Sequence, residues 1–183
     1  ATHNQRMKLA AIEGMWETQP APASFTAFAI PDQQAQRNHY EVHIPYVMGL
    51  IATRSLDQEI PGILELVERA EQRVKGGQIA YAALQRIRAD KNDVEAREVF
   101  DRHWQDLGHG LLLKRYRDDI GNATPEEIAQ APVDTVPTVA PLFWTFRAMV
   151  GIGFYLIGFF AVAFYFSCRN NFEDKKLFLK IAL

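Results

Sequence analysis

The sequence predicts an all-α membrane protein fragment: a helical extracytoplasmic loop domain with irregular connectors, one full transmembrane helix and the start of a second. The first observation is the stretch from Ala148 to Cys168, which contains neither a charged residue nor a proline. A helix needs about 20 such residues to cross the hydrocarbon of a bilayer. The second observation is a series of amphipathic helical patterns upstream, and the third is that the last ten residues, DKKLFLKIAL, stop inside another apolar pattern.

A buried core helix is the alternative for this apolar stretch. The rest of the small chain is too polar to surround such a rod on all sides, so the membrane interpretation is favoured. We therefore divide the chain into a loop region, 1–138, a transmembrane helix, 139–168, and a turn with the start of the next helix, 169–183.

Charge predicts the orientation and excludes one class of partner. The formal net charge of −2 gives no basic field for nucleic acid. Four cations follow the span and acidic residues precede it, so the positive-inside rule places the C-terminal end in the cytoplasm and residues 1–138 on the other side. These cations are Arg169, Lys175, Lys176 and Lys180. Residues 1–15 lack the apolar core of a secretory signal, and we expect the chain to be a piece of a longer one.

The first predicted helix covers Gln5 to Glu17, because Leu9, Ile12 and Trp16 recur at helical spacing. Glu13 and Glu17 share another face of this helix. Lys8 borders that face imperfectly, since a five-residue step turns by about 140°. A solvated helix face is the alternative to a binding role for these charged residues.

The middle of the chain predicts extended connectors followed by helices. Prolines after Thr18 disfavour helix, and Tyr40–Ile44 alternates like a short strand. His39 and His43 within this part lack the further ligands of a metal site. Three helical patterns follow, starting at Pro61 and ending at Gly76 and Gly77, then over Gln78–Arg88, then within Asp93–Tyr116. Thr124, Pro125 and Glu127 have the spacing of a capping box that starts a short helix.

Two pairs of residues suggest redox chemistry. Met149 lies near the start of the apolar stretch, and a thioether is one of the axial ligands that haem iron accepts. Arg147 beside it is suited to stabilise a haem propionate or the added electron. A carboxylate such as Glu13 with a cation such as Lys8 suits a site that binds a hydroxyl group and accepts its proton.

Four segments carry a resemblance to a known family. They are KLAAIEGMWETQPAPASF from Lys8, IPYVMGLIATRSLD from Ile44, LGHGLLLKRY from Leu107 and VAPLFWTFRAMVGIGF from Val139. In this order they resemble subunit I of cytochrome bd quinol oxidases, over the long quinol loop and the membrane helix that follows it. None of the five histidines matches a haem ligand of that family.

The resemblance implies a role for each position. Lys8 and Glu13 match the lysine and glutamate associated with quinol binding and oxidation, with Glu13 as proton acceptor. Met149 matches the axial ligand of the iron in the low-spin haem b, and Arg147 matches the arginine beside that haem. A further haem b and haem d, with ligands outside this chain, would belong to the intact enzyme.

The expected setting is a bacterial inner membrane, with residues 1–138 in the periplasm. Expected partners are quinol, the remainder of subunit I, subunit II and small subunits, and the lipid bilayer. The alternative is a single-span membrane protein whose helical extracytoplasmic domain binds a partner and has no redox role.

Overall fold

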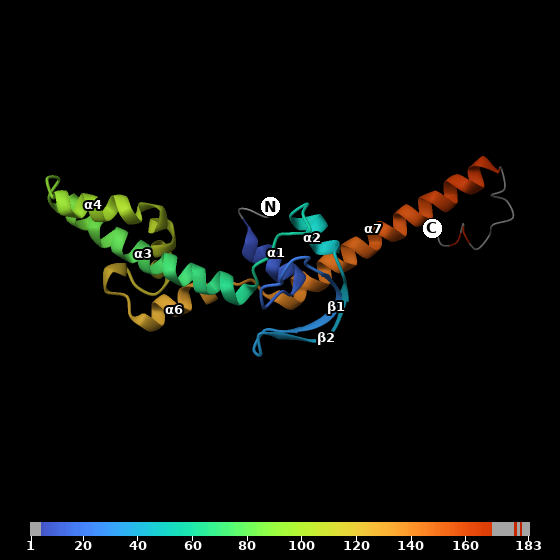
Figure 1. Cartoon of the computed structure of the whole chain (residues 1–183), viewed down its shortest axis with the longest axis horizontal. Coiled ribbons are helices and arrows are strands. Elements are labelled where there is room, and N and C mark those ends of the chain that lie inside the picture. The colour runs from blue at the N-terminus through green and yellow to red at the C-terminus, as the bar shows by residue number, and fades with distance from the viewer. Residues whose placement is uncertain (1–4, 170–177, 179, 181–183) are drawn as a thin grey trace. The chain divides into compact units, whose positions relative to one another are not determined.

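The computed structural model describes residues 5–169, 178 and 180 (Figure 1). The chain divides into two compact units, Ala1–Phe143 and Trp144–Leu183. Most of the described residues are helical, as predicted. The expected start of a second membrane helix falls almost wholly outside the described residues.

The first unit begins with helix α1, Arg6–Glu13, which is shorter than the predicted helix. Gly14 adopts a left-handed conformation with φ of 65° and ends it. The N–H groups of Gly14 and Met15 donate to the carbonyl oxygens of Ala11 and Ala10, at 3.2 and 2.8 Å. This is a Schellman motif, which satisfies carbonyls that a helix end leaves free. Glu17 consequently lies outside the helix.

A two-stranded sheet follows, so the prediction of a purely α-helical fold is wrong. Strand β1, Phe25–Asp32, pairs antiparallel with β2, Arg37–Ile44, with Phe25 opposite Ile44 and Asp32 opposite Arg37. The turn between them is held by the Asp32 carboxylate, which accepts the N–H groups of Gln34 and Ala35 at 3.0 and 2.9 Å. These backbone donors, led by that of Ala35, lower the pKa of Asp32.

Helices make up the rest of the first unit. They are α2 (Val47–Ala52), α3 (Ile63–Ala89), α4 (Val94–His103), η1 (Trp104–Asp106), α5 (Leu107–Gly110), η2 (Leu111–Arg115), η3 (Ile120–Asn122) and α6 (Pro125–Val133). The prediction that Gly76 and Gly77 stop a helix is wrong, because α3 continues through both. The predicted capping box at Thr124 is confirmed at the start of α6.

Two apolar cores stabilise this unit. The first joins the end of α1 to α2, to the start of α3 and to the first residue of the last helix; it contains Ala10, Ala11, Met15, Trp16, Ala23, Met48, Ile60, Ile63 and Val139. The second lies between α3, η2, η3 and α6 and contains Val74, Leu113, Ile120, Ile128 and Ala131. The sheet and α1 therefore share a core with the residue at which the last helix begins.

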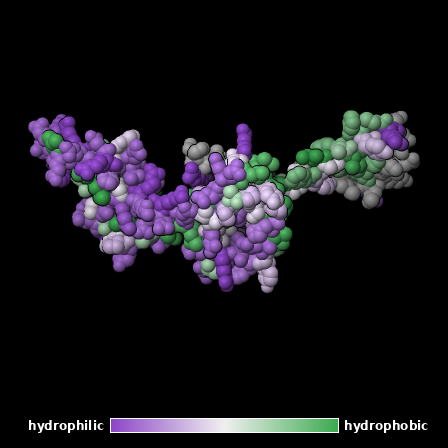
Figure 2. Space-filling view, in the orientation of Figure 1, coloured by the Kyte–Doolittle hydropathy of each residue, from purple (hydrophilic) through white to green (hydrophobic). Residues whose placement is uncertain are grey.

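The last helix, α7, runs from Val139 to Cys168 and is the one described helix with the length and composition to cross a membrane. Its most apolar stretch has a mean hydropathy of 2.0, and none of that stretch is buried within the chain. Apolar side chains gather along α7 in Figure 2, whereas hydrophilic residues predominate over α3 and α4. A helix that is apolar on every side suits a lipid or protein interior.

Candidate functional site

Glu13 is the last residue of α1, and its side chain is only 3% exposed. The left-handed turn at Gly14 places this end of α1 close to the Phe143 ring: a Cβ added at Gly14 would lie 3.1 Å from Cδ2 of Phe143. Burying a carboxylate is costly unless it is hydrogen-bonded. In the described part of the chain, no buried side-chain oxygen or nitrogen lacks a hydrogen-bond partner. The solvated-face alternative is therefore wrong for Glu13.

Lys8 lies five residues earlier on α1, and its side chain is exposed. The corresponding turn of about 140° directs the two side chains to different sides of the helix. The solvated-face alternative thus fits Lys8 in this chain, although it does not fit Glu13. A single ligand therefore reaches both residues only if it lies across the helix.

Two surface cavities flank α1. The larger, of about 600 Å³, is lined by Arg6, Leu9, Ile51, Ala52, Thr53, Arg54, Gln58, Glu59, Ile60 and Pro61. The smaller, of about 370 Å³, is lined by the segment that begins at Gly14 and by polar side chains of both strands. Both volumes are within the range of small-molecule sites. Neither cavity is lined by Lys8 or Glu13.

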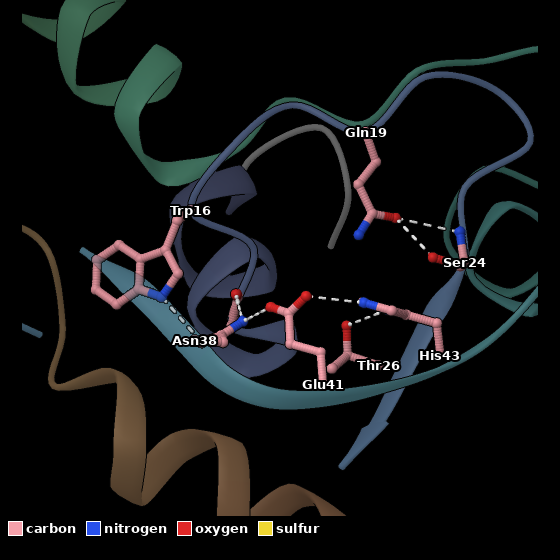
Figure 3. Close-up of polar contacts among 8 residues, drawn as sticks. Trp16, Gln19, Ser24, Thr26, Asn38, Glu41 and His43 are labelled. Atoms are coloured by element: carbon pink, nitrogen blue, oxygen red, sulfur yellow. Dashed lines mark hydrogen bonds and ion pairs between the residues drawn. The ribbon is translucent and has the colours of Figure 1, made fainter. Parts of the chain in front are cut away.

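A chain of polar side chains connects the sheet to the segment after α1 (Figure 3). The Trp16 indole N–H donates to Asn38 Oδ1 at 2.9 Å, and Asn38 Nδ2 donates to Glu41 Oε1 at 2.6 Å. Glu41 Oε2 lies 2.9 Å from His43 Nε2, and His43 Nδ1 lies 3.3 Å from the Thr26 hydroxyl. Sequence patterns did not reveal this network, because Trp16, Thr26 and the members from β2 lie in separate segments of the chain and belong to no motif.

A second polar connection ties the same segment to α3. The Thr18 hydroxyl accepts the N–H of Gly62 at 3.1 Å and donates to the Glu65 carboxylate. This hydrogen bond is the main cause of the lowered pKa of Glu65. The segment after Glu13 is thus hydrogen-bonded to the sheet through Trp16 and to α3 through Thr18.

Arg147 and Met149 lie on the part of α7 that belongs to the second unit. The Met149 side chain is 61% exposed, and Arg147 is partly buried. A two-residue step turns a helix by about 200°, so the two side chains leave α7 on different sides. A thioether is one of the axial ligands that haem iron accepts. No cluster of three or more histidine, cysteine or acidic residues that could hold a metal occurs among the described residues.

Comparison with known proteins gives matches over the whole chain. The family model of cytochrome bd terminal oxidase subunit I matches residues 1–183. The chain is 37% identical over 179 residues to cytochrome bd-II ubiquinol oxidase subunit 1 of Escherichia coli (strain K12), covering 98% of this chain and 35% of that protein. It is 23% identical over 180 residues to cytochrome bd ubiquinol oxidase subunit 1 of Bacillus subtilis (strain 168), covering 98% of this chain and 26% of that protein.

The chain spans about a third of the length of the first relative and about a quarter of the length of the second. The range that the family model matches includes both α1 and α7. The chain belongs to the cytochrome bd terminal oxidase subunit I family.

Proposed function

We propose that this chain is the quinol-oxidising loop and a haem-ligating helix of a cytochrome bd-type terminal oxidase. The reaction is the oxidation of a quinol to the quinone, which releases an electron pair and both hydroxyl protons. In the intact complex these electrons reduce dioxygen to water. The remainder of subunit I, subunit II and small subunits complete that complex.

The observation that carries the proposal is the buried Glu13 at the end of α1. Glu13 accepts a proton from a quinol hydroxyl, which is the role of a carboxylate general base placed within reach of that hydroxyl. Lys8, on the other side of α1, is free to move in solvent and donates a hydrogen bond to a quinol oxygen. A quinol that contacts both side chains therefore lies across α1.

Met149 would hold the iron of the low-spin haem b through its sulfur, and Arg147 would stabilise a propionate of that haem or the added electron. When bound, this haem would supply the acceptor for the quinol electrons, and a further haem b and haem d, with ligands outside this chain, would supply the oxygen-reducing centre. The role of this chain is to present the sulfur of Met149 from an apolar helix. A thioether supports this role because it is one of the axial ligands that haem iron accepts.

The proposed setting is a bacterial inner membrane. Cations after the span, beginning with Arg169, and acidic residues before it support a cytoplasmic C-terminal end. The loop unit then faces the periplasm. Protons accepted by Glu13 leave on that side, and quinol oxidation contributes to the proton gradient.

The test replaces Glu13 by Gln in the full-length oxidase. We expect quinol oxidation to fall by about 10² to 10⁴-fold, the usual contribution of a general base, with the haem spectrum retained. Glu17→Gln is the matched control, because Glu17 lies four residues later and is exposed. An active Glu13→Gln enzyme would remove Glu13 from the mechanism. Absence of b- and d-type bands from the purified wild-type oxidase would contradict the proposed function as a whole.

A further inference from the structure

Asn38, in strand β2, uses its whole side-chain amide to hold the end of α1. Its Nδ2 donates to the carbonyl oxygen of Gly14 at 2.7 Å and to Glu41 Oε1 at 2.6 Å, while its Oδ1 accepts the indole N–H of Trp16 at 2.9 Å. An amide has two N–H donors and one oxygen, so each is matched here. A flipped amide would place its oxygen against two acceptors. The surrounding groups therefore fix the orientation of Asn38.

Gln33, in the turn that joins the two strands, holds the start of α7. Its Oε1 accepts the backbone N–H of Val139 at 2.9 Å, across 106 residues of sequence. The first N–H groups of a helix have no partner within the helix. Gln33 supplies one for α7 from a distant part of the chain.

Side-chain packing joins the same two helix ends. Val139 and Phe143, one turn apart on α7, are both 0% exposed. Val139 belongs to the core that contains Ala10 and Ala11 of α1. Phe143 contacts the position of Gly14, where an added Cβ would be tight against the ring. The strand pair therefore tethers two helix ends that already pack together.

We propose that Asn38 and Gln33 are positioning residues for quinol oxidation, which fix the end of α1, and with it Glu13, against the first turn of α7. This inference rests on the proposed function of Glu13. Gly14, which Asn38 holds, directly follows Glu13 in the chain. Neither amide touches the quinol in this account; each acts by setting where the carboxylate lies.

The experiment measures quinol oxidation per haem in the purified, full-length oxidase. Asn38→Asp keeps the acceptor for Trp16 but loses both donors and places a carboxylate beside Glu41 and the Gly14 carbonyl. Displacing a catalytic group by 1 Å lowers the rate by up to about 10²-fold, so we expect kcat to fall by about tenfold, with a smaller rise in KM.

Gln33→Ala removes a single hydrogen bond and is expected to lower kcat by about threefold. Gln34→Ala is its control, because the Gln34 side chain is exposed and only its backbone N–H is used.

A double substitution separates positioning from a general loss of structure. In an oxidase that already carries Glu13→Gln, Asn38→Asp should cause no further loss per haem, because the residue that it positions is gone. Equal fold losses in the two backgrounds would overturn the proposal. If Asn38→Asp prevents assembly, the comparison of Gln33→Ala with Gln34→Ala tests the proposal instead. Equal kcat values in these two variants would overturn the proposal.

The proposed function fails in a different way. If Glu13→Gln alone leaves turnover unchanged, then the role of Glu13 is wrong and the positioning role falls with it. If Glu13→Gln is impaired while Asn38→Asp and Gln33→Ala retain full turnover per haem, only the positioning role is wrong.

Discussion

The two units of the chain differ in how their functional residues are supported. In the loop unit, Glu13 is buried by contacts that the chain itself provides, at the edge of a core shared by α1, α2 and α3. In the second unit, Met149 and most large apolar side chains of α7 are exposed. The proposed acid–base residue is thus buried by the chain's own contacts, whereas the proposed haem ligand is exposed in the described part of the chain.

Physical chemistry accounts for the contrast. The loop unit folds in water, where burying apolar surface provides the main driving force and a buried carboxylate must be matched by hydrogen bonds. A membrane helix has no such driving force, because lipid tails are as apolar as its own side chains. Substitutions in the loop unit should therefore change its folding stability, whereas substitutions in the second unit should change the haem spectrum.

The largest expected effect is that of Met149→Leu. Leucine keeps the volume and apolar character of the side chain but has no sulfur, so the iron loses the proposed axial ligand. We expect the low-spin haem b bands to disappear from the reduced-minus-oxidised visible spectrum of the full oxidase.

Met48→Leu is the matched control, since Met48 is 2% exposed in the loop core. Volume-conserving core substitutions cost less than about 1.5 kcal/mol, so this variant should keep the spectrum. An unaltered spectrum in Met149→Leu would exclude Met149 as a haem ligand, and the second unit would then have no proposed iron ligand.

Local patterns in the sequence predicted α7 and the start of α6. The uncharged stretch before Cys168 and the spacing of Thr124 and Glu127 are both properties of a short window of sequence. The alternation at Tyr40–Ile44 likewise predicted part of β2. Local patterns did not predict the burial of Glu13, because residues distant in sequence, such as Phe143, pack near the end of α1.

Gly77 shows most clearly why a local rule failed. Paired glycines usually end a helix, yet α3 continues, because Gly77 is where the backbone of α5 comes closest. A Cβ added there would lie 2.3 Å from both the Asp106 carbonyl oxygen and the Gly110 nitrogen. The glycine allows two backbones to touch, and its effect on helix propensity is secondary.

The second prediction follows from this contact. Gly77→Ala gains about 1 kcal/mol of helix propensity but forces backbone atoms apart, which costs about 3 kcal/mol at the upper end of overpacking. We expect a net loss of about 2 kcal/mol in the free energy of local opening, measured by hydrogen exchange of α3 amides in the full oxidase. The control, Gly108→Ala, has no atom within 4 Å of the added Cβ and should not destabilise α3. Equal protection of α3 in both variants would show that the contact does not matter.

The smallest predicted effect concerns the N-cap of α6. The Thr124 hydroxyl accepts the N–H of Glu127 at 3.3 Å, and Glu127 Oε2 accepts the N–H of Thr124 at 2.8 Å. Thr124→Ala should lower the opening free energy of α6 by about 1 kcal/mol, whereas Thr124→Ser keeps the hydroxyl and most of the protection. Hydrogen exchange of the α6 amides measures both, and the haem spectrum should not change in either variant.

The pH dependence of α6 protection tests the other half of this capping box. The Thr124 N–H, followed by Arg117, lowers the pKa of Glu127 below its ordinary value of 4.5. Because the pKa of Glu127 is lower in the folded than in the unfolded state, the ionised side chain stabilises folded α6 above pH 4.5. This stabilisation is lost as the pH falls through the pKa that Glu127 has in the folded state. Glu127→Gln should therefore weaken the protection of α6 at neutral pH and approach wild type in acid. At the lowest pH, wild-type Glu127 is protonated and as uncharged as the glutamine that replaces it. If the protection of α6 still differed between wild type and Glu127→Gln at that pH, the stabilisation would come from side-chain packing and not from the charge.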